Sequence, residues 1–166
     1  MPKHTISAEE ARQLLSYNPE TGTFTWRVGR GKARVGSVAG TPCSGGYFQI
    51  RIYGRIYSAH RLAWLLTHGV WPENQIDHIN GRRDDNRLCN LRLATRSENN
   101  RNAKRRSDNT SGVKGVSFDK ARDRWRAQIR VSGRNRHMGY HKTPEEAYAA
   151  YCKAAAEHYG EFANFG

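Results

Sequence analysis

Asp77 and His78 are the residues of this chain whose types and spacing point most directly to chemistry. They are adjacent, a short Asn-Gly sequence follows them, and Asn90 and Asn99 lie 13 and 22 residues after Asp77. Carboxylate and amide oxygens are ligands that Mg²⁺ accepts in proteins, and an imidazole titrates close to neutral pH. One divalent cation and one histidine base are sufficient to hydrolyse a phosphodiester. The four residues therefore predict a small metal site that cuts phosphodiesters.

These side chains must be positioned by a bend at the end of a strand. Neighbouring residues of a regular strand point to opposite sides, so Asp77 and His78 can share one face only where the strand ends or turns. The Asn80-Gly81 pair is typical of such a turn. We expect a strand that ends at Asp77-His78, a loop over residues 80–86, a return strand over residues 91–93, and a helix that carries Asn99.

The residues before this unit predict an extension of helices and hairpins. Residues 7–16 are typical of a helix, because Ser7 is a suitable N-cap and Glu10 follows three residues later, as in a capping box. Residues 23–27 alternate as a strand, and residues 47–58 predict a hairpin that turns at Gly54. Leu62, Leu65 and Leu66 recur at helical spacing, so we expect residues 60–68 to form a helix that buries them.

The residues after Asn102 predict a second domain. Residues 104–110 are polar and basic, as in a linker, and strands are expected near residues 113–118, 124–131 and 134–140. Thr143-Pro144 is typical of a helix start, with proline at the first helical position and acids in the first turn. A sheet backed by one helix is the expected architecture.

The charge of the chain indicates a nucleic-acid partner. The formal net charge is +13, and between Arg101 and Arg136 twelve Lys or Arg residues stand against three acids, a net +9 in that stretch. Such a concentration of positive charge attracts phosphates. The N-terminal residues lack the apolar region of a signal peptide, no long apolar run is present, and three widely spaced cysteines give no disulfide or zinc pattern, so an intracellular protein with no membrane span is expected.

The segment around Trp125 predicts a strand that reads DNA. Trp125, Ala127 and Ile129 alternate with long polar side chains, so they would face the core while the polar residues form the opposite face. That face carries few acids, and arginine can pair with guanine and glutamine with adenine in the major groove. The polar face comprises Arg124, Arg126, Gln128 and Arg130. A solvated strand face with no ligand is the alternative.

About residues 10–103 resemble the HNH endonucleases of phage and mobile-intron type. The likeness is carried by residues 60–64, 71–72, 76–81, 85–87, 90–92 and 98–102. It implies that Asp77 is a metal ligand, His78 the general base, Asn90 a brace of the loop, and Asn99 the second metal ligand. Many family members have histidine at the positions of Asp77 and Asn99, and the oxygen-rich set here favours one Mg²⁺ or Mn²⁺ per chain over Zn²⁺.

Other polar residues of this region have more than one possible role. Asp84, Asp85 and Asn86 could ligate the metal, although capping of the loop is the stronger reading. His60 is either a group behind the site's ligands or a contact to the phosphate, or else a packing residue at a helix start. Asn102, one turn beyond Asn99, is a fallback ligand.

About residues 110–163 resemble the Apetala/ethylene-response-factor DNA-binding domain. The likeness is carried by residues 111–116, 125–130, 138–140 and 143–151. That family lays a three-stranded antiparallel sheet, backed by one helix, in the major groove, which implies that Asn135 and His137 face bases together with Gln128 and Arg130. Ser117 and Asp119 stand where the family often places arginines, so its recognised sequence does not transfer.

Together these patterns predict an α+β chain with a ββα-metal nuclease domain over residues 1–103, a basic linker over residues 104–110, and a sheet-plus-helix DNA-binding domain over residues 111–166. The expected function is a metal-dependent, site-directed endonuclease of homing type that nicks double-stranded DNA as a monomer or weak dimer. A non-catalytic DNA-binding regulator that keeps the ββα unit as a scaffold is the main alternative. An RNA-binding protein is disfavoured, because the A-form major groove is too narrow for a strand to read.

Overall fold

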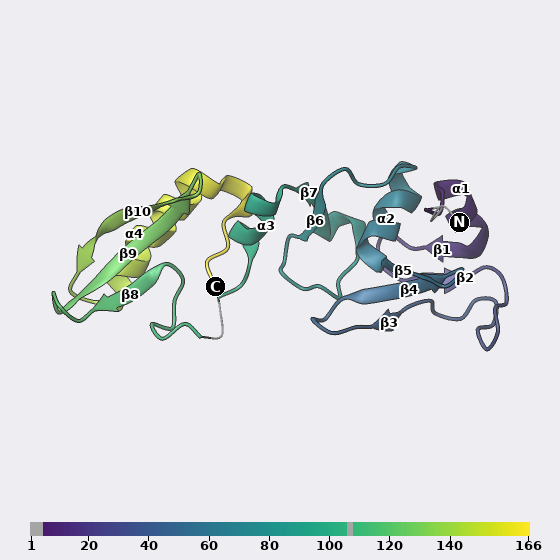
Figure 1. The fold of residues 1–166 in the computed structure, drawn as a ribbon, viewed down its shortest axis with the longest axis horizontal. Helices are drawn as coiled ribbons and strands as arrows, with labels where there is room; N and C mark the ends of the chain where they lie inside the picture. Colours follow the sequence, from purple (N-terminus) through teal and green to yellow (C-terminus); the bar gives the residue numbers. More distant parts are fainter. Residues whose placement is uncertain (1–4, 106–107) are drawn as a thin grey trace. The chain divides into compact units, whose positions relative to one another are not determined.

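The computed structural model describes residues 5–105 and 108–166, which form two compact units. The first unit ends at Arg96, and the second runs from Ser97 to Gly166 (Figure 1). The described residues make a mixed α/β fold with four α-helices and several small antiparallel sheets. None of the helices in these residues is long and apolar enough to cross a bilayer.

The first unit begins with a capped helix that leads directly into a strand. Helix α1 (Ala8–Leu14) starts at Ser7, whose hydroxyl accepts from the Glu10 N–H while the Glu10 carboxylate accepts from the Ser7 N–H, so the predicted capping box is confirmed. The predicted helical end was wrong, because Leu15 and Ser16 pair with a second strand instead. These strands are β1 (Leu15–Tyr17) and β2 (Phe24–Trp26).

A three-stranded sheet and a second helix complete the core of this unit. The strands are β3 (Thr41–Pro42), β4 (Phe48–Ile52) and β5 (Arg55–Ser58), and helix α2 (Ala59–His68) follows at once. The predicted hairpin turn is present, with positive φ at both Tyr53 and Gly54, as a two-residue hairpin of the primed type requires. Leu62 and Leu65 are buried as predicted, whereas Leu66 only packs against the core from its edge.

A short antiparallel pair presents the residues of chemical interest. Strand β6 (Gln75–His78) ends at His78, the 3₁₀ turn η1 (Leu88–Asn90) follows the loop, and β7 (Leu91–Ala94) returns beside β6. Helix α3 (Arg96–Asn102) comes next, and from Ser97 on it belongs to the second unit. The predicted order of strand, loop, strand and helix is therefore observed.

The second unit is a three-stranded antiparallel sheet packed on one helix. The strands lie in the order β10-β9-β8, and Ala127 and Ile129 on the central strand are buried against α4, as predicted for the helix-facing side. Helix α4 starts at Thr143, whose hydroxyl accepts from the Glu146 N–H, with Pro144 first in the helix. The elements are β8 (Val116–Asp119), β9 (Arg124–Val131), β10 (Arg134–His141), α4 (Pro144–Tyr159) and the 3₁₀ turn η2 (Gly160–Phe162).

The compact units divide the chain after Arg96, inside the range 1–103 expected for the nuclease domain. The predicted linker, residues 104–110, is described only in part, because residues 106 and 107 lie outside the described residues. The domain boundaries 1–103 and 111–166 stay predictions.

Candidate active site and nucleic-acid interface

Asp77 and His78 are both buried at the end of β6. Their exposed fractions are 3% and 5%, unusual for a carboxylate and an imidazole that stand next to each other. Chain reversal begins immediately after His78, where the Gly81 N–H donates to the His78 carbonyl and Gly81 adopts a φ of 67°. The Asn-Gly turn thus lies where the sequence placed it, and it lets the loop fold back over the strand end.

Arg92 holds the Asp77 carboxylate from the neighbouring strand. The two residues are register partners of β6 and β7, and Arg92 Nε donates to Asp77 Oδ2 over 2.9 Å. Arg92 Nη2 lies 2.8 Å from the same oxygen. Sequence reasoning missed this ion pair, although opposite charges on adjacent strands of a predicted hairpin could have suggested it. The pair fixes the carboxylate of the expected metal ligand at one of its two oxygens.

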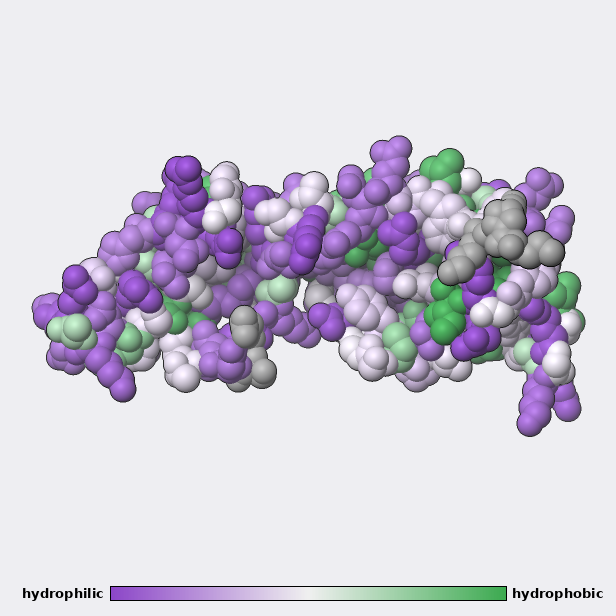
Figure 2. Space-filling view, in the orientation of Figure 1, coloured by the Kyte–Doolittle hydropathy of each residue, from purple (hydrophilic) through white to green (hydrophobic). Residues whose placement is uncertain are grey.

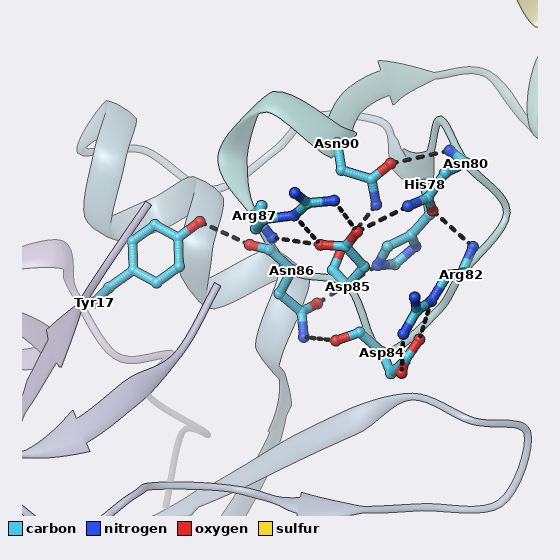
Figure 3. Close-up of polar contacts among 9 residues, drawn as sticks. All are labelled: Tyr17, His78, Asn80, Arg82, Asp84, Asp85, Asn86, Arg87 and Asn90. Atoms are coloured by element: carbon cyan, nitrogen blue, oxygen red, sulfur yellow. Dashed lines mark hydrogen bonds and ion pairs between the residues drawn. The ribbon is translucent and has the colours of Figure 1, made fainter. Parts of the chain in front are cut away.

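The loop between β6 and β7 is closed by Asn90. Its Oδ1 accepts from the Asn80 N–H over 2.9 Å, and its Nδ2 donates to the Asp85 carbonyl over 2.8 Å, so one side chain ties the start of the loop to its end (Figure 3). Asn90 is itself buried, with 5% of its surface exposed. The family likeness implied such a brace, and the part of Asn90 in catalysis stays a prediction.

Asp85 accepts hydrogen bonds from several donors of the loop. Its carboxylate accepts from Arg87 Nε and Nη2, at 2.8 and 2.6 Å, and from Asn80 Nδ2 at 2.8 Å (Figure 3). These hydrogen bonds, led by those from Arg87, hold the pKa of Asp85 well below its usual range. Asp84 pairs with Arg82 at the exposed side of the loop. Both carboxylates thus contact cations of their own loop, the geometry of loop capping.

The N-terminal extension supports the loop from behind. The Tyr17 hydroxyl donates to the Asn86 carbonyl over 2.7 Å, and the Leu88 N–H donates to the Pro19 carbonyl. Gly22 has a φ of 73°, and a Cβ at this position would meet the Arg87 nitrogen at 2.5 Å. Only glycine allows that approach without a shift of the backbone. The strand pair β1–β2 therefore helps to set the position of the loop.

Aromatic rings and one amide surround the His78 imidazole. Nε2 of His78 lies 3.5 Å from Asn86 Oδ1, and the rings of His60 and Tyr47 stand 5.2 and 5.9 Å from the His78 ring, centroid to centroid. Burial lowers the pKa of His78 below its ordinary value, and the contact with Asn86 opposes only part of that shift. Asn86 and Tyr47 were not predicted as neighbours of the base, because no sequence spacing links them to it.

The His60 ring, on α2, lies against the ring of His78, the expected base. Burial, with a smaller effect of His78, lowers the pKa of His60 to about 4. Its Nδ1 atom is buried, and among the described residues it has no hydrogen-bond partner. His60 thus contacts the His78 ring from α2 as a neutral imidazole, and its role in the site stays a prediction.

Asn99, the expected second metal ligand, lies on α3. Asn99 belongs to the second compact unit, whereas Asp77 belongs to the first. That the two residues bind one ion together therefore stays a prediction. In the described part of the chain no three His, Cys, Asp or Glu side chains gather into a metal cluster. The predicted donor set is of a different kind, one buried carboxylate with amide oxygens, and such hard oxygen donors suit Mg²⁺ or Mn²⁺.

The predicted DNA-reading residues lie on the second unit. Arg124 and Arg130 are exposed, Arg126 and Gln128 are half-buried, and Arg126 Nη2 donates to the Ser117 hydroxyl across the sheet. On β10, Asn135 and His137 are the register partners of Arg130 and Gln128. The sheet therefore brings four of the six predicted residues together as two adjacent cross-strand pairs. Figure 2 shows that hydrophilic residues dominate the visible surface over β8–β10.

Comparisons with known proteins agree with the geometry of the first unit. An HNH endonuclease family model matches residues 57–101, the segment that contains α2, β6, β7 and most of α3. Protein 3.8 of Escherichia phage T7 is 36% identical over 117 residues, which cover 68% of this chain and 96% of that protein. The uncharacterized HNH endonuclease L560 of Acanthamoeba polyphaga mimivirus is 28% identical over 146 residues, 87% of this chain and 68% of that protein. No solved structure gives a significant match.

The family match covers the residues that close the loop and carry the buried Asp77-His78 pair, and the phage relative is matched over nearly its whole length. These likenesses show that residues 57–101 of this chain belong to the HNH endonuclease family and that the chain is related to Protein 3.8 of Escherichia phage T7.

Proposed function

We propose that this chain is a metal-dependent, site-directed DNA endonuclease of homing type that nicks one strand per active site. Family membership supports a nuclease and implies DNA as the substrate. The observation that carries the proposal is the buried His78 imidazole at the end of β6, next to the buried carboxylate of Asp77. Few structural roles require two titratable groups to be buried side by side.

His78 is assigned as the general base. A base must be unprotonated to take a proton from the attacking water, and burial of His78 lowers its pKa and so favours the neutral form. Asn90 keeps the loop around the imidazole closed by hydrogen bonds to the Asn80 N–H and the Asp85 carbonyl, at 2.9 and 2.8 Å. Little reorganisation of the loop is then needed when the phosphate arrives.

Asp77 and Asn99 would hold the cation, one Mg²⁺ or Mn²⁺ per chain. Bound there, the ion would supply charge relief on the phosphoryl oxygens and on the leaving oxygen. Arg92 contributes by holding Asp77 Oδ2, which orients the carboxylate before any ligand binds. His60 would act behind His78 as a neutral imidazole that contacts the base and not the substrate.

The second unit would find the target on double-stranded DNA. The polar sheet face has long donors at the spacing of alternate strand residues, and the stretch from Arg101 to Arg136 has a net charge of +9. Arg124, Arg126, Gln128, Arg130, Asn135 and His137 are the proposed contacts. The arrangement of a sheet backed by α4 is the one implied by the likeness to the Apetala/ethylene-response-factor domain.

A non-catalytic DNA-binding regulator is the second candidate. The ion pair between Asp77 and Arg92 favours it, because a carboxylate that is held by an arginine at 2.8 Å can serve to join two strands of a scaffold. In that case the buried Asp77 would be structural and the protein would bind DNA without cutting it.

Cleavage of supercoiled plasmid with Mg²⁺ and with EDTA separates the two candidates. The endonuclease is expected to give nicked circles with Mg²⁺, with ends that carry a 5′-phosphate and a 3′-hydroxyl, and intact plasmid with EDTA. Intact plasmid under both conditions at low salt, together with a shift of the DNA in a gel, would leave the regulator.

A further inference from the structure

Helix α3 lacks the means to be stable by itself. It has seven residues, Arg96 to Asn102, all of them polar, and Asn102 is its only buried residue. Helices of this length are unstable in water unless tertiary contacts hold them, and α3 has no apolar face to bury. Its conformation must therefore depend on specific polar contacts.

Contacts of this kind from the second unit meet the C-terminal end of the helix. Lys114 Nζ donates to the carbonyls of Arg101 and Ala103, at 3.1 and 2.8 Å. Asn164 Nδ2 donates to the Asn102 carbonyl at 2.8 Å and contacts the Asn102 side-chain oxygen at 3.3 Å. The last carbonyls of a helix lack partners within it, and a cation there also complements the helix dipole. Lys114 and Asn164 thus supply what this end of α3 needs.

A further contact links α3 to the central strand of the sheet. The Arg101 guanidinium lies 5.1 Å from the centroid of the Tyr159 ring, and the Tyr159 hydroxyl donates to the Arg130 carbonyl over 2.8 Å. Arg130 belongs to β9, the strand proposed to read DNA. A cavity of about 620 Å³ is lined both by α3, through Asn100, and by the proposed reading residues Gln128, Arg130 and Asn135. DNA bound at these residues would therefore lie beside the end of α3.

We propose that Lys114 and Asn164 are positioning residues that hold α3 on the DNA-binding unit, so that this unit supports the metal ligand Asn99 as well as finding the target. The proposal rests on the proposed function in one point, the role of Asn99 as a ligand. It assigns the C-terminal unit a second part, support of the helix that carries Asn99, which recognition of the target alone does not require. Both residues are proposed to act through α3, and Lys114 also lines the cavity beside the reading residues.

The test uses Mn²⁺ binding in place of cleavage. Full-length His78→Ala protein on duplex DNA is titrated with Mn²⁺ and followed by electron paramagnetic resonance, alone and with Lys114→Met added. Lys153→Met is the matched control, because Lys153 is an exposed lysine of α4 in the same unit. We expect Lys114→Met to weaken Mn²⁺ binding about tenfold, and Lys114→Arg to restore most of it. Mn²⁺ affinity is compared at DNA concentrations that saturate each variant, so that a change in DNA affinity caused by the lost charge does not enter the comparison.

Hydrogen exchange gives a second readout that does not involve the metal. Lys114→Met should speed exchange at the amides near residues 100–103 and leave β8–β10 protected. If Lys114→Met unfolds the whole unit, Asn164→Ala provides the same comparison from the other contact. Equal Mn²⁺ affinity and equal exchange in Lys114→Met and Lys153→Met would overturn the inference. If Asn99→Ala also leaves Mn²⁺ affinity unchanged, the proposed metal site fails as well, which separates the two failures.

Discussion

Asp77 and Arg92 face each other across β6 and β7, and both Nε and Nη2 of the arginine contact Oδ2 of the carboxylate, at 2.9 and 2.8 Å. The side chains are 4% and 13% exposed, so the pair is almost removed from water. The carboxylate expected to bind the cation is therefore oriented by the protein itself, from the strand that leads into α3.

Arg92→Met should lower both stability and activity. Removal of one partner leaves a buried carboxylate without its counter-charge, a change that costs about 3 kcal/mol. The free energy of unfolding, measured by urea denaturation, is expected to fall by that amount. Arg27→Met removes an exposed arginine of the same unit and should change it by less than about 0.5 kcal/mol. Equal free energies of unfolding for the two variants would show that the ion pair does not stabilise the fold.

Asn90→Ala should open the loop around His78. The substitution removes two hydrogen bonds and leaves the Asn80 N–H and the Asp85 carbonyl without their partner, which costs roughly 2 kcal/mol. The cleavage rate should fall by more than the loss of folded protein explains, because the loop surrounds the base. Asn74→Ala, at an exposed residue before β6, is the control. Wild-type cleavage by Asn90→Ala would show that the loop needs no brace.

Stability should depend on pH through His60. Its pKa is lowered to about 4 in the folded protein, whereas an unfolded histidine titrates near 6.5. Between these values the unfolded chain binds more protons, so the free energy of unfolding falls as the pH drops from about 6.5 towards 4, by roughly 2–3 kcal/mol in all. His60→Gln removes this titration and should flatten the decline, as denaturation at a series of pH values would reveal. An unchanged slope in His60→Gln would argue against a buried neutral imidazole.

Gln128→Ala should reduce sequence preference without changing the salt dependence of binding. Gln128 is uncharged, so it releases no counterions, while loss of a base contact costs roughly 1–3 kcal/mol of discrimination. The measurement is fluorescence anisotropy at several salt concentrations, on a target enriched from a random library and on a scrambled duplex. Lys153→Ala serves as the control away from the sheet. If the variant prefers the enriched target as strongly as wild type does, Gln128 reads no base.

Local sequence signals predicted the elements that depend on neighbouring residues. The capping box at Ser7 and Glu10, the turn at Gly54 and the proline start of α4 involve contacts within four residues, and all are present. Leu15 and Ser16 were assigned to the helix because nothing nearby stops it. Their pairing with β2, a contact made by residues about ten positions later, decides the structure instead.

The neighbours of the site were harder to predict, because they come from distant parts of the sequence. Asp77, His78 and Asn90 could be singled out because they lie at the end of β6 and in the segment that joins it to β7. Tyr47 and His60 reach the His78 ring from other elements, and Tyr17 supports the loop from 69 residues away. No sequence motif indicated Lys114 and Asn164, because any side chain with a hydrogen-bond donor can bind the carbonyls at the C-terminal end of a helix. Such contacts become visible only when the chain is folded.

The cleavage rate of His78→Ala in Mg²⁺ tests the central claim most directly. Wild type and His158→Ala, a histidine on α4, should nick supercoiled plasmid at similar rates, while His78→Ala should be slower by roughly 10²–10⁴-fold, the usual contribution of a general base. All three should bind the plasmid equally in EDTA. Equal cleavage by His78→Ala and wild type would contradict the assignment of His78 as the base.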